Sequence, residues 1–143
     1  ACRAAGELSG LTPGALDDFL FRHAQLQRTT QAMPGVLGFL ASLRQQEILT
    51  GIASNAQRYT FDELATVGLP VDQFEPDLCF WSFEQGFSKP DPAVFSQLNE
   101  RLAARGILPE ETLMIGDRLD NDIEPARAAG WQVWHFQGTW PVL

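Results

Sequence analysis

Apolar side chains along the chain alternate between a helical spacing and short uninterrupted runs. Between residues 12 and 30 they recur every three or four positions, which predicts an amphipathic helix with Thr12 as its N-cap. A second helix is predicted to begin at Pro34. The apolar, β-branched run at 48–54 follows this helix and predicts a buried strand that ends at Ser54.

The same succession of helix and strand continues to the end of the sequence. Strands that alternate with helices in this way form βαβ units, in which the strands are parallel and helices cover both faces of the sheet. The predicted fold class is therefore α/β. Further helices are expected at 56–69, 91–106 and 120–130, each closed by a glycine, and further strands at 77–81, 112–116 and 132–136.

Composition and charge restrict the classes of function. The 143 residues are 45% hydrophobic, enough for one core, but the longest apolar runs fall far short of the roughly 20 residues that cross a membrane. A net charge of -8 argues against nucleic-acid binding, whereas a small phosphorylated substrate needs only a few positive groups. Cys2 and Cys79 are too far apart to indicate a disulfide framework or a zinc site, so a reducing cytoplasmic location is expected.

Polar side chains follow three of the predicted strands. Ser54 and Asn55 stand at the end of the first, Lys89 follows the second, and Gly116 and Asp117 end the third. In an open parallel sheet, ligands bind outside the carboxyl ends of the strands. An ammonium group and a helix N-terminus suit a phosphate, and grouped carboxylates suit Mg²⁺.

The stretch TLMIGDRLDND brings Asp117, Asp120 and Asp122 within six positions. Carboxylates crowded together repel one another unless a cation or a hydrogen-bond donor holds them. Each polar group also has a purely structural interpretation: Asp120 as the N-cap of a helix near Asn121, the first aspartate as a turn residue, the serine as a helix cap and the lysine as a solvated loop residue. Their order on successive strand ends is the specific signal, and it indicates a phosphate and metal site.

These ordered groups resemble the motifs of the haloacid dehalogenase (HAD) superfamily, whose members are mostly Mg²⁺-dependent phosphatases. PGVLGFLASLRQQEILTGIASNAQ is similar to the second motif, a helix and strand ending in Ser or Thr, and FWSFEQGFSKPDPAVF is similar to the segment with the third motif's lysine. TLMIGDRLDNDIEPARAAG is similar to the acidic fourth motif, GDxxxxD. The resemblance covers residues 34 to 136 and implies a Rossmann-like, three-layer α/β/α core.

The resemblance implies a role for each matching residue. The serine would donate its hydroxyl to the transferring phosphoryl group, helped by the backbone N–H groups that follow it. The lysine would neutralise phosphate charge and hold the nucleophilic carboxylate. The first aspartate of the acidic motif would bind Mg²⁺ directly and the last one directly or through water, with Asp120 outside the site. The expected catalytic residues are Ser54 and Lys89, the phosphate-binding residues Ser54, Asn55, Ala56 and Lys89, and the metal ligands Asp117 and Asp122.

The sequence departs from the family pattern at the nucleophile. The resemblance implies a first strand ending in Asp-x-Asp-x followed by Thr or Val, whose first Asp attacks phosphorus and whose second is the general acid. No such motif precedes Ser54 in the 143 residues. We therefore expect this chain alone to be inactive, as a fragment whose central strand belongs to a missing N-terminal segment or to a strand-donating second chain. Its absence should leave a gap in the sheet.

The expected organisation is a partial helical cap at residues 1–31 and a HAD-like core at 32–143 that lacks its first strand. The implied function is a Mg²⁺-dependent phosphatase that acts on a small phosphorylated metabolite through an aspartyl-phosphate intermediate. The alternatives are a 2-haloacid dehalogenase or a sugar-phosphate mutase of the same fold, or a noncatalytic phosphate- or metal-binding pseudo-hydrolase. The acidic run weighs against the dehalogenase, because a metal-free site has no need for that charge.

Overall fold

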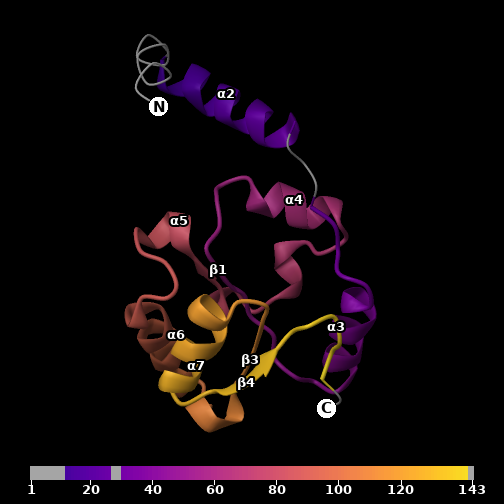
Figure 1. The fold of residues 1–143 in the computed structure, drawn as a ribbon, viewed down its shortest axis with the longest axis vertical. Helices are drawn as coiled ribbons and strands as arrows, with labels where there is room; N and C mark the ends of the chain where they lie inside the picture. The colour runs from indigo at the N-terminus through magenta and orange to yellow at the C-terminus, as the bar shows by residue number, and fades with distance from the viewer. Residues whose placement is uncertain (1–11, 27–29, 142–143) are drawn as a thin grey trace. The chain divides into compact units, whose positions relative to one another are not determined.

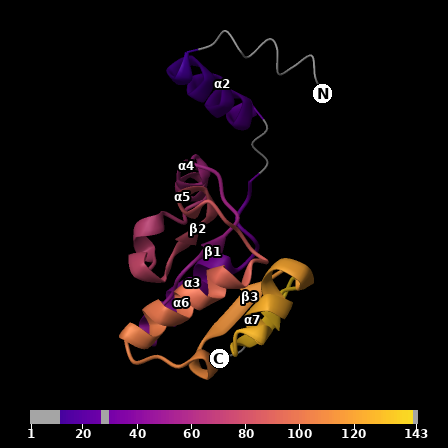
Figure 2. The same cartoon turned by 90° about the vertical axis from the view of Figure 1, so that its left-hand side faces the viewer.

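The computed structural model describes residues 12–26 and 30–141 (Figures 1 and 2). The chain divides into two compact units, Ala1–Gln31 and Ala32–Leu143. This division falls where the sequence analysis separates a cap segment from a core, and the role of the first unit as part of a cap stays a prediction. Cys2 lies outside the described residues.

The described part of the first unit is one helix, α2 (Pro13–Leu26), as predicted. The hydroxyl oxygen of Thr12 accepts a hydrogen bond from the N–H of Ala15 at 3.3 Å. Thr12 therefore satisfies one of the N–H groups that a helix N-terminus leaves without an intrahelical partner, and its predicted capping role is confirmed.

The second unit alternates helices and strands in the predicted order, which confirms the α/β class. The short helix α5 was not predicted. The predicted helix-closing residues Gly68, Gly106 and Gly130 have φ of 82°, 74° and 91°, a left-handed conformation that favours glycine. The elements are α3 (Val36–Gln45), β1 (Ala53–Ser54), α4 (Thr60–Thr66), β2 (Phe80–Trp81), α5 (Ser82–Gln85), α6 (Pro92–Ala104), β3 (Leu113–Gly116), a π-helical turn (Leu119–Ile123), α7 (Glu124–Ala128) and β4 (Gln132–His135), with 3₁₀ turns at Val71–Gln73, Pro76–Leu78 and Pro109–Glu111.

The strands form two separate parallel pairs, β1 with β2 and β3 with β4. Within the described residues no strand joins β1 to β3, which agrees with the expected gap in the sheet. Strand β1 is shorter than the predicted run 48–54. Among the described residues, the segment just before β1 has a hydrogen-bonded neighbour on one flank. The N–H of Glu75 donates to the carbonyl of Thr50, and the N–H of Phe80 donates to the carbonyl of Ile52. A segment that pairs on one flank makes fewer ladder hydrogen bonds than a central strand, which explains why β1 is short.

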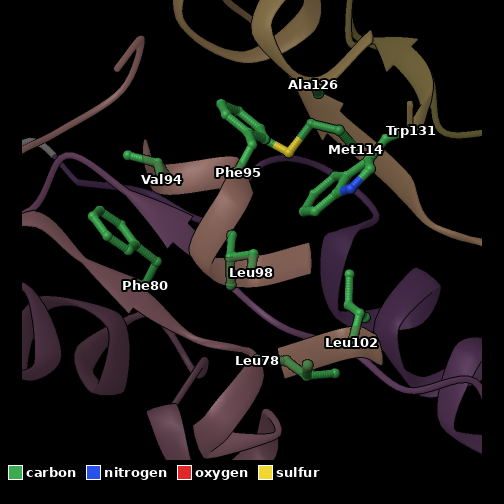
Figure 3. Packing of buried hydrophobic residues seen from close by; sticks show 9 residues of the cluster. All are labelled: Leu78, Phe80, Val94, Phe95, Leu98, Leu102, Met114, Ala126 and Trp131. Atoms are coloured by element: carbon green, nitrogen blue, oxygen red, sulfur yellow. The ribbon is translucent and has the colours of Figure 1, made fainter. Parts of the chain in front are cut away.

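Helices α3 and α6 lie on opposite sides of β3 and β4 in Figure 1, and in the turned view of Figure 2 α6 stands in front of α3. Helix α6 starts at the N-cap Asp91, whose side chain accepts from the N–H of Ala93 at 2.9 Å. Its apolar stripe meets β3 and α7 in the main core, whose side chains are labelled in Figure 3. That core consists of Leu78, Phe80, Val94, Phe95, Leu98, Leu102, Met114, Ala126 and Trp131.

Helix α3 is less buried than its apolar spacing predicts. Leu43 is buried, whereas Leu37, another apolar residue of this helix, is 48% exposed. None of the helices in residues 12–26 and 30–141 is long and apolar enough to cross a lipid bilayer.

Candidate functional site

Lys89 and Asp122 form a buried ion pair where the strand ends meet. The ammonium Nζ lies 2.5 Å from the carboxylate Oδ1, and the two side chains are only 9% and 8% exposed. Lys89 is the only lysine in the sequence, where the other nine basic residues are arginines. Since lysine is rarely buried unless it is paired, the solvated-loop interpretation of Lys89 is wrong.

A close approach to Gly116 brings the Asp122 carboxylate to this position. A Cβ added at Gly116 would stand 2.4 Å from the Cβ of Asp122, so only glycine leaves room for that side chain. The second carboxylate oxygen of Asp122 accepts from the N–H of Arg118 at 3.2 Å. The π-helical turn thus carries Asp122 back against Gly116, and this contact fixes the position of the carboxylate.

Asn55 links the end of β1 to the backbone of Lys89. Its Nδ2 donates to the Lys89 carbonyl and its Oδ1 accepts from the Lys89 N–H, both at 2.8 Å. Both the donor and the acceptor group of the Asn55 side chain are thus directed at Lys89, and the contact with phosphate predicted for Asn55 is through its backbone N–H. The neighbouring Ser54 is half-buried, and its hydroxyl has no hydrogen-bond partner in the part of the chain that the structure describes.

Asp117 is an exposed residue of the acidic motif, as Asp120 is. It follows β3 directly, and its carboxylate has no hydrogen-bond or ion-pair partner among the described residues. Its backbone carbonyl accepts from His135, whose Nε2 lies 3.0 Å away. Sequence analysis missed His135, although the parallel register that pairs Gly116 with His135 could have indicated it.

Asp120 is engaged by its neighbour Arg118. The Nε and Nη2 of Arg118 lie 3.1 and 2.7 Å from the two carboxylate oxygens. These hydrogen bonds lower the pKa of Asp120 below its ordinary value and raise that of Arg118. The alternative role of Asp120 as an N-cap is wrong, because the helical turn begins at Leu119 and no side chain caps it.

An open groove of about 970 Å³ separates the two strand pairs. The chain lines it with residues 48–53 on one flank and 111–117 on the other, with Leu43 of α3 and Leu98 of α6 closing its sides. Lys89, Asp117 and Asp122 belong to the same lining. The candidate site therefore opens onto the gap between the strands.

The hydrogen bonds between β3 and β4 show which backbone groups of β3 face the groove. The carbonyls of Thr112 and Gly116 accept from the N–H groups of Gln132 and Phe136, which face β4. In a parallel ladder the residues of a strand direct their N–H and C=O alternately to its two edges. The backbone groups of Leu113 and Ile115 are therefore directed at the groove.

The predicted metal ligands are two carboxylates, Asp117 and Asp122. No group of three or more His, Cys, Asp or Glu side chains placed to hold a metal occurs in residues 12–26 and 30–141. Mg²⁺ is commonly held by one or two carboxylates together with water and substrate phosphate oxygens, so Asp117 and Asp122 suffice as a protein contribution. Because Asp122 already binds Lys89 and Arg118, Asp117 is the freer of the two ligands.

Comparisons with known proteins find related phosphatases and hydrolases. The chain is 32% identical to glyceraldehyde 3-phosphate phosphatase from Pyrococcus furiosus, over 78% of this chain and 45% of that protein. It is 31% identical to phosphoserine phosphatase from Thermus thermophilus, over 97% and 54% of the two chains. The HAD-hydrolase YfnB from Bacillus subtilis, solved bound to magnesium, superposes with a TM-score of 0.61 at 29% identity, over 71% and 43%.

The chain thus spans about half the length of the curated relatives it matches. The sequence model of the haloacid dehalogenase-like hydrolases matches residues 4–130, which is most of the chain. The family resemblance of the three motifs is therefore confirmed, and with it the α/β fold. The chain belongs to the haloacid dehalogenase-like hydrolase family.

Proposed function

We propose that this chain contributes the phosphate- and metal-binding groups of a Mg²⁺-dependent phosphatase that acts on a small phosphorylated metabolite. The observation that carries the proposal is the buried Lys89–Asp122 pair, together with a Ser54 hydroxyl that has no hydrogen-bond partner among the described residues. A buried ammonium group at the end of a parallel sheet suits an anionic substrate. The relatives named for the phosphates of glyceraldehyde and serine support this substrate class.

In this proposal the phosphate lies among the groups at the end of β1. The Ser54 hydroxyl and the backbone N–H groups of Asn55 and Ala56 donate hydrogen bonds to its oxygens. Lys89 supplies a positive charge that neutralises the transferring phosphoryl group. The free Ser54 hydroxyl and the engaged Asn55 side chain both support this division of roles.

Asp117 binds Mg²⁺ directly in this proposal, and Asp122 orients the site from beside Lys89 or completes the metal's coordination. The exposed, unpartnered carboxylate of Asp117 supports its assignment, as does the magnesium in the related hydrolase. Bound Mg²⁺ would supply positive charge that stabilises the phosphoryl oxygens as the reaction proceeds.

We further propose that the groove receives a parallel strand from outside these 143 residues, and that this strand brings the nucleophile. Both flanks of the groove belong to parallel pairs with free inner edges, which suits one more parallel strand. In this proposal a carboxylate at the end of that strand joins Asp122 beside the Lys89 ammonium group, which lines the same groove. We propose that this strand belongs to a segment N-terminal to these residues in the same polypeptide.

The reaction follows from that carboxylate. One of its oxygens forms a bond to phosphorus while the bond from phosphorus to the substrate oxygen breaks, and the leaving oxygen takes a proton from the second Asp of the strand. Water then attacks phosphorus while giving a proton back to that second Asp, and the bond between phosphorus and the aspartate oxygen breaks, which releases inorganic phosphate and restores the carboxylate. Lys89 holds the attacking carboxylate in position through both steps.

An assay on the chain extended at its N-terminus by an apolar strand ending in Asp-x-Asp-x-Thr tests the function. We expect hydrolysis of small phosphate monoesters that needs Mg²⁺ and is abolished by a chelator. Ser54→Ala should lower kcat about 10²-fold, as the loss of one donor to the reacting group does in other enzymes.

The same preparation distinguishes the alternatives. Metal-independent release of halide from a 2-haloacid would identify a dehalogenase, and conversion of one sugar phosphate into its isomer would identify a mutase. Phosphate binding without any turnover would leave a noncatalytic module. Each of these results would contradict the phosphatase proposal.

A further inference from the structure

The Asn55 amide pairs with both backbone groups of a single residue 34 positions away, Lys89. One hydrogen bond is donated and one accepted, each at 2.8 Å. Of the side chains of this length, only an amide carries both a donor and an acceptor in this geometry. The contact fixes the backbone of Lys89 without touching its ammonium group.

We propose that Asn55 is a positioning residue, which holds the Lys89 backbone so that the ammonium group is aimed at Asp122 and at the bound anion. The proposal rests on the phosphate site described above and adds to it a residue that acts through another. The Asn55 side chain itself makes no contact with phosphate in this arrangement.

Lys89 needs such a support because of where it lies. It belongs to the loop between α5 and α6, so neither helix nor strand fixes its backbone. Its side chain is long and has many rotamers, and an unfixed backbone would let the ammonium group swing away from the site. A group fixed before substrate binds avoids that ordering cost during the reaction.

Asn99 provides a matched control in the same chain. It also bridges two distant groups, since its Nδ2 donates to the Ala129 carbonyl at 3.2 Å and its Oδ1 accepts from the Trp131 Nε1 at 2.6 Å. Those contacts join α6 to the core and involve no residue of the candidate site. Asn99→Ala therefore removes an equivalent pair of hydrogen bonds without affecting Lys89.

The single lysine makes the experiment specific. Labelling with ¹⁵N-lysine gives one backbone amide signal and one side-chain ammonium signal, and both belong to Lys89. Hydrogen exchange of each signal is measured in the unaltered chain and in the Asn55→Ala and Asn99→Ala variants. The same signals are then followed during titration with inorganic phosphate, and circular dichroism checks that each variant is folded.

Asn55→Ala should speed the exchange of both Lys89 signals at least ~10-fold and weaken phosphate binding about 10-fold, the effect of losing a pair of modest hydrogen bonds. Asn99→Ala should leave exchange and phosphate affinity within about twofold, because it lowers stability elsewhere. A folded Asn55→Ala chain with unchanged exchange and affinity would overturn the proposal. An equal loss in Asn99→Ala would overturn it too, by tracing the effect to general destabilisation.

Asn55→Asp keeps the size and the acceptor of the side chain but loses the donor. It tests the positioning role of Asn55 if the alanine variant does not fold. We expect the Lys89 amide to stay protected while its ammonium group exchanges faster, and slow exchange of both would contradict the positioning role. Failure of the unaltered chain to bind phosphate would count against the proposed function. The exchange of the Lys89 signals would still decide whether Asn55 holds it.

Discussion

Gly116 and Asp122 approach so closely that a Cβ on the glycine would stand 2.4 Å from the Cβ of the aspartate. The two residues open and close the acidic motif, and their contact turns the carboxylate toward Lys89. The motif's glycine is thus required by packing, and a methyl group there should disturb the site as well as the fold.

Gly116→Ala should lower the free energy of unfolding by about 1–3 kcal/mol, the usual cost of forcing a group into a packed site. Urea unfolding measures the change. Gly38 is the matched control, because it lies within α3 with nothing within 4 Å of an added Cβ. Gly38→Ala should raise stability by up to about 1 kcal/mol through helix propensity. Equal effects at the two glycines would disprove the steric argument.

The Lys89–Asp122 pair should be strongly coupled. Either Lys89→Met or Asp122→Asn leaves the partner buried without its counter-charge and should cost about 3–5 kcal/mol. The double variant should cost clearly less than the sum, with a coupling of at least ~1 kcal/mol in a double-mutant cycle. The exposed pair between Arg118 and Asp120 is the control and should show no resolvable coupling. Additive losses for the buried pair would mean that the two groups are not bound in solution.

Sequence alone predicts the features that local chemistry determines. Thr12 caps a helix through its own hydroxyl, and short apolar runs form strands wherever a parallel partner is present. The link from Asn55 to Lys89 escaped prediction because it joins loops 34 residues apart, and nothing near either residue signals it. The helix cap assigned to Asp120 failed because Arg118, two residues away, binds the carboxylate more strongly than a helix terminus would.

Asp117 should dominate the affinity for Mg²⁺. Asp117→Asn keeps the shape of the side chain and removes its charge, so calorimetric titration should show Mg²⁺ affinity reduced at least ~10-fold, about 1.4 kcal/mol. Asp120→Asn is the control, since that carboxylate is already held by Arg118, and its Mg²⁺ affinity should stay within about twofold. Unchanged binding in the Asp117 variant would refute the assignment.

A surface ion pair should make stability depend on pH in the acid range. Hydrogen bonds from Arg105 hold the pKa of Asp77 below its ordinary value of 3.8. A carboxyl whose pKa is lowered on folding stabilises the folded state above its unfolded pKa, and this contribution is lost as the pH falls through the lowered value. The Asp77→Asn variant should therefore be less stable than the unaltered chain at pH 7. This difference in the free energy of unfolding should shrink as the pH falls below 3.8.

Urea midpoints measured from neutral to acid pH test this dependence. Asp72→Asn is the control, because Asp72 is exposed and has no hydrogen-bond or ion-pair partner among the described residues. It should match the unaltered chain at every pH. A difference for Asp77→Asn that persists in strong acid would exclude the ion pair as its cause.

The groove between the strand pairs should accept one parallel strand. The backbone N–H and C=O groups of Leu113 and Ile115 are directed into the groove, whereas those of Met114 between them are directed at β4. Adding an apolar strand that ends in Asp-x-Asp-x-Thr to the N-terminus should therefore slow amide exchange at Leu113 and Ile115 and leave Met114 nearly unchanged. Each buried backbone group that gains a partner avoids a cost of about 1–3 kcal/mol, so the extended chain should also be several kcal/mol more stable.

Phosphatase activity should depend on the same added strand. The 143-residue chain, verified by mass to begin at Ala1, should hydrolyse no phosphate ester, because no Asp-x-Asp-x motif followed by Thr or Val precedes Ser54 in it. The extended chain should gain Mg²⁺-dependent turnover, and a matched extension with Asn for the first Asp should give the same amide protection without turnover. That control separates filling the groove from supplying the nucleophile. Robust Mg²⁺-dependent turnover by the unextended chain would mean that the nucleophile lies among its own residues, and turnover without protection of Leu113 and Ile115 would mean that the strand binds elsewhere.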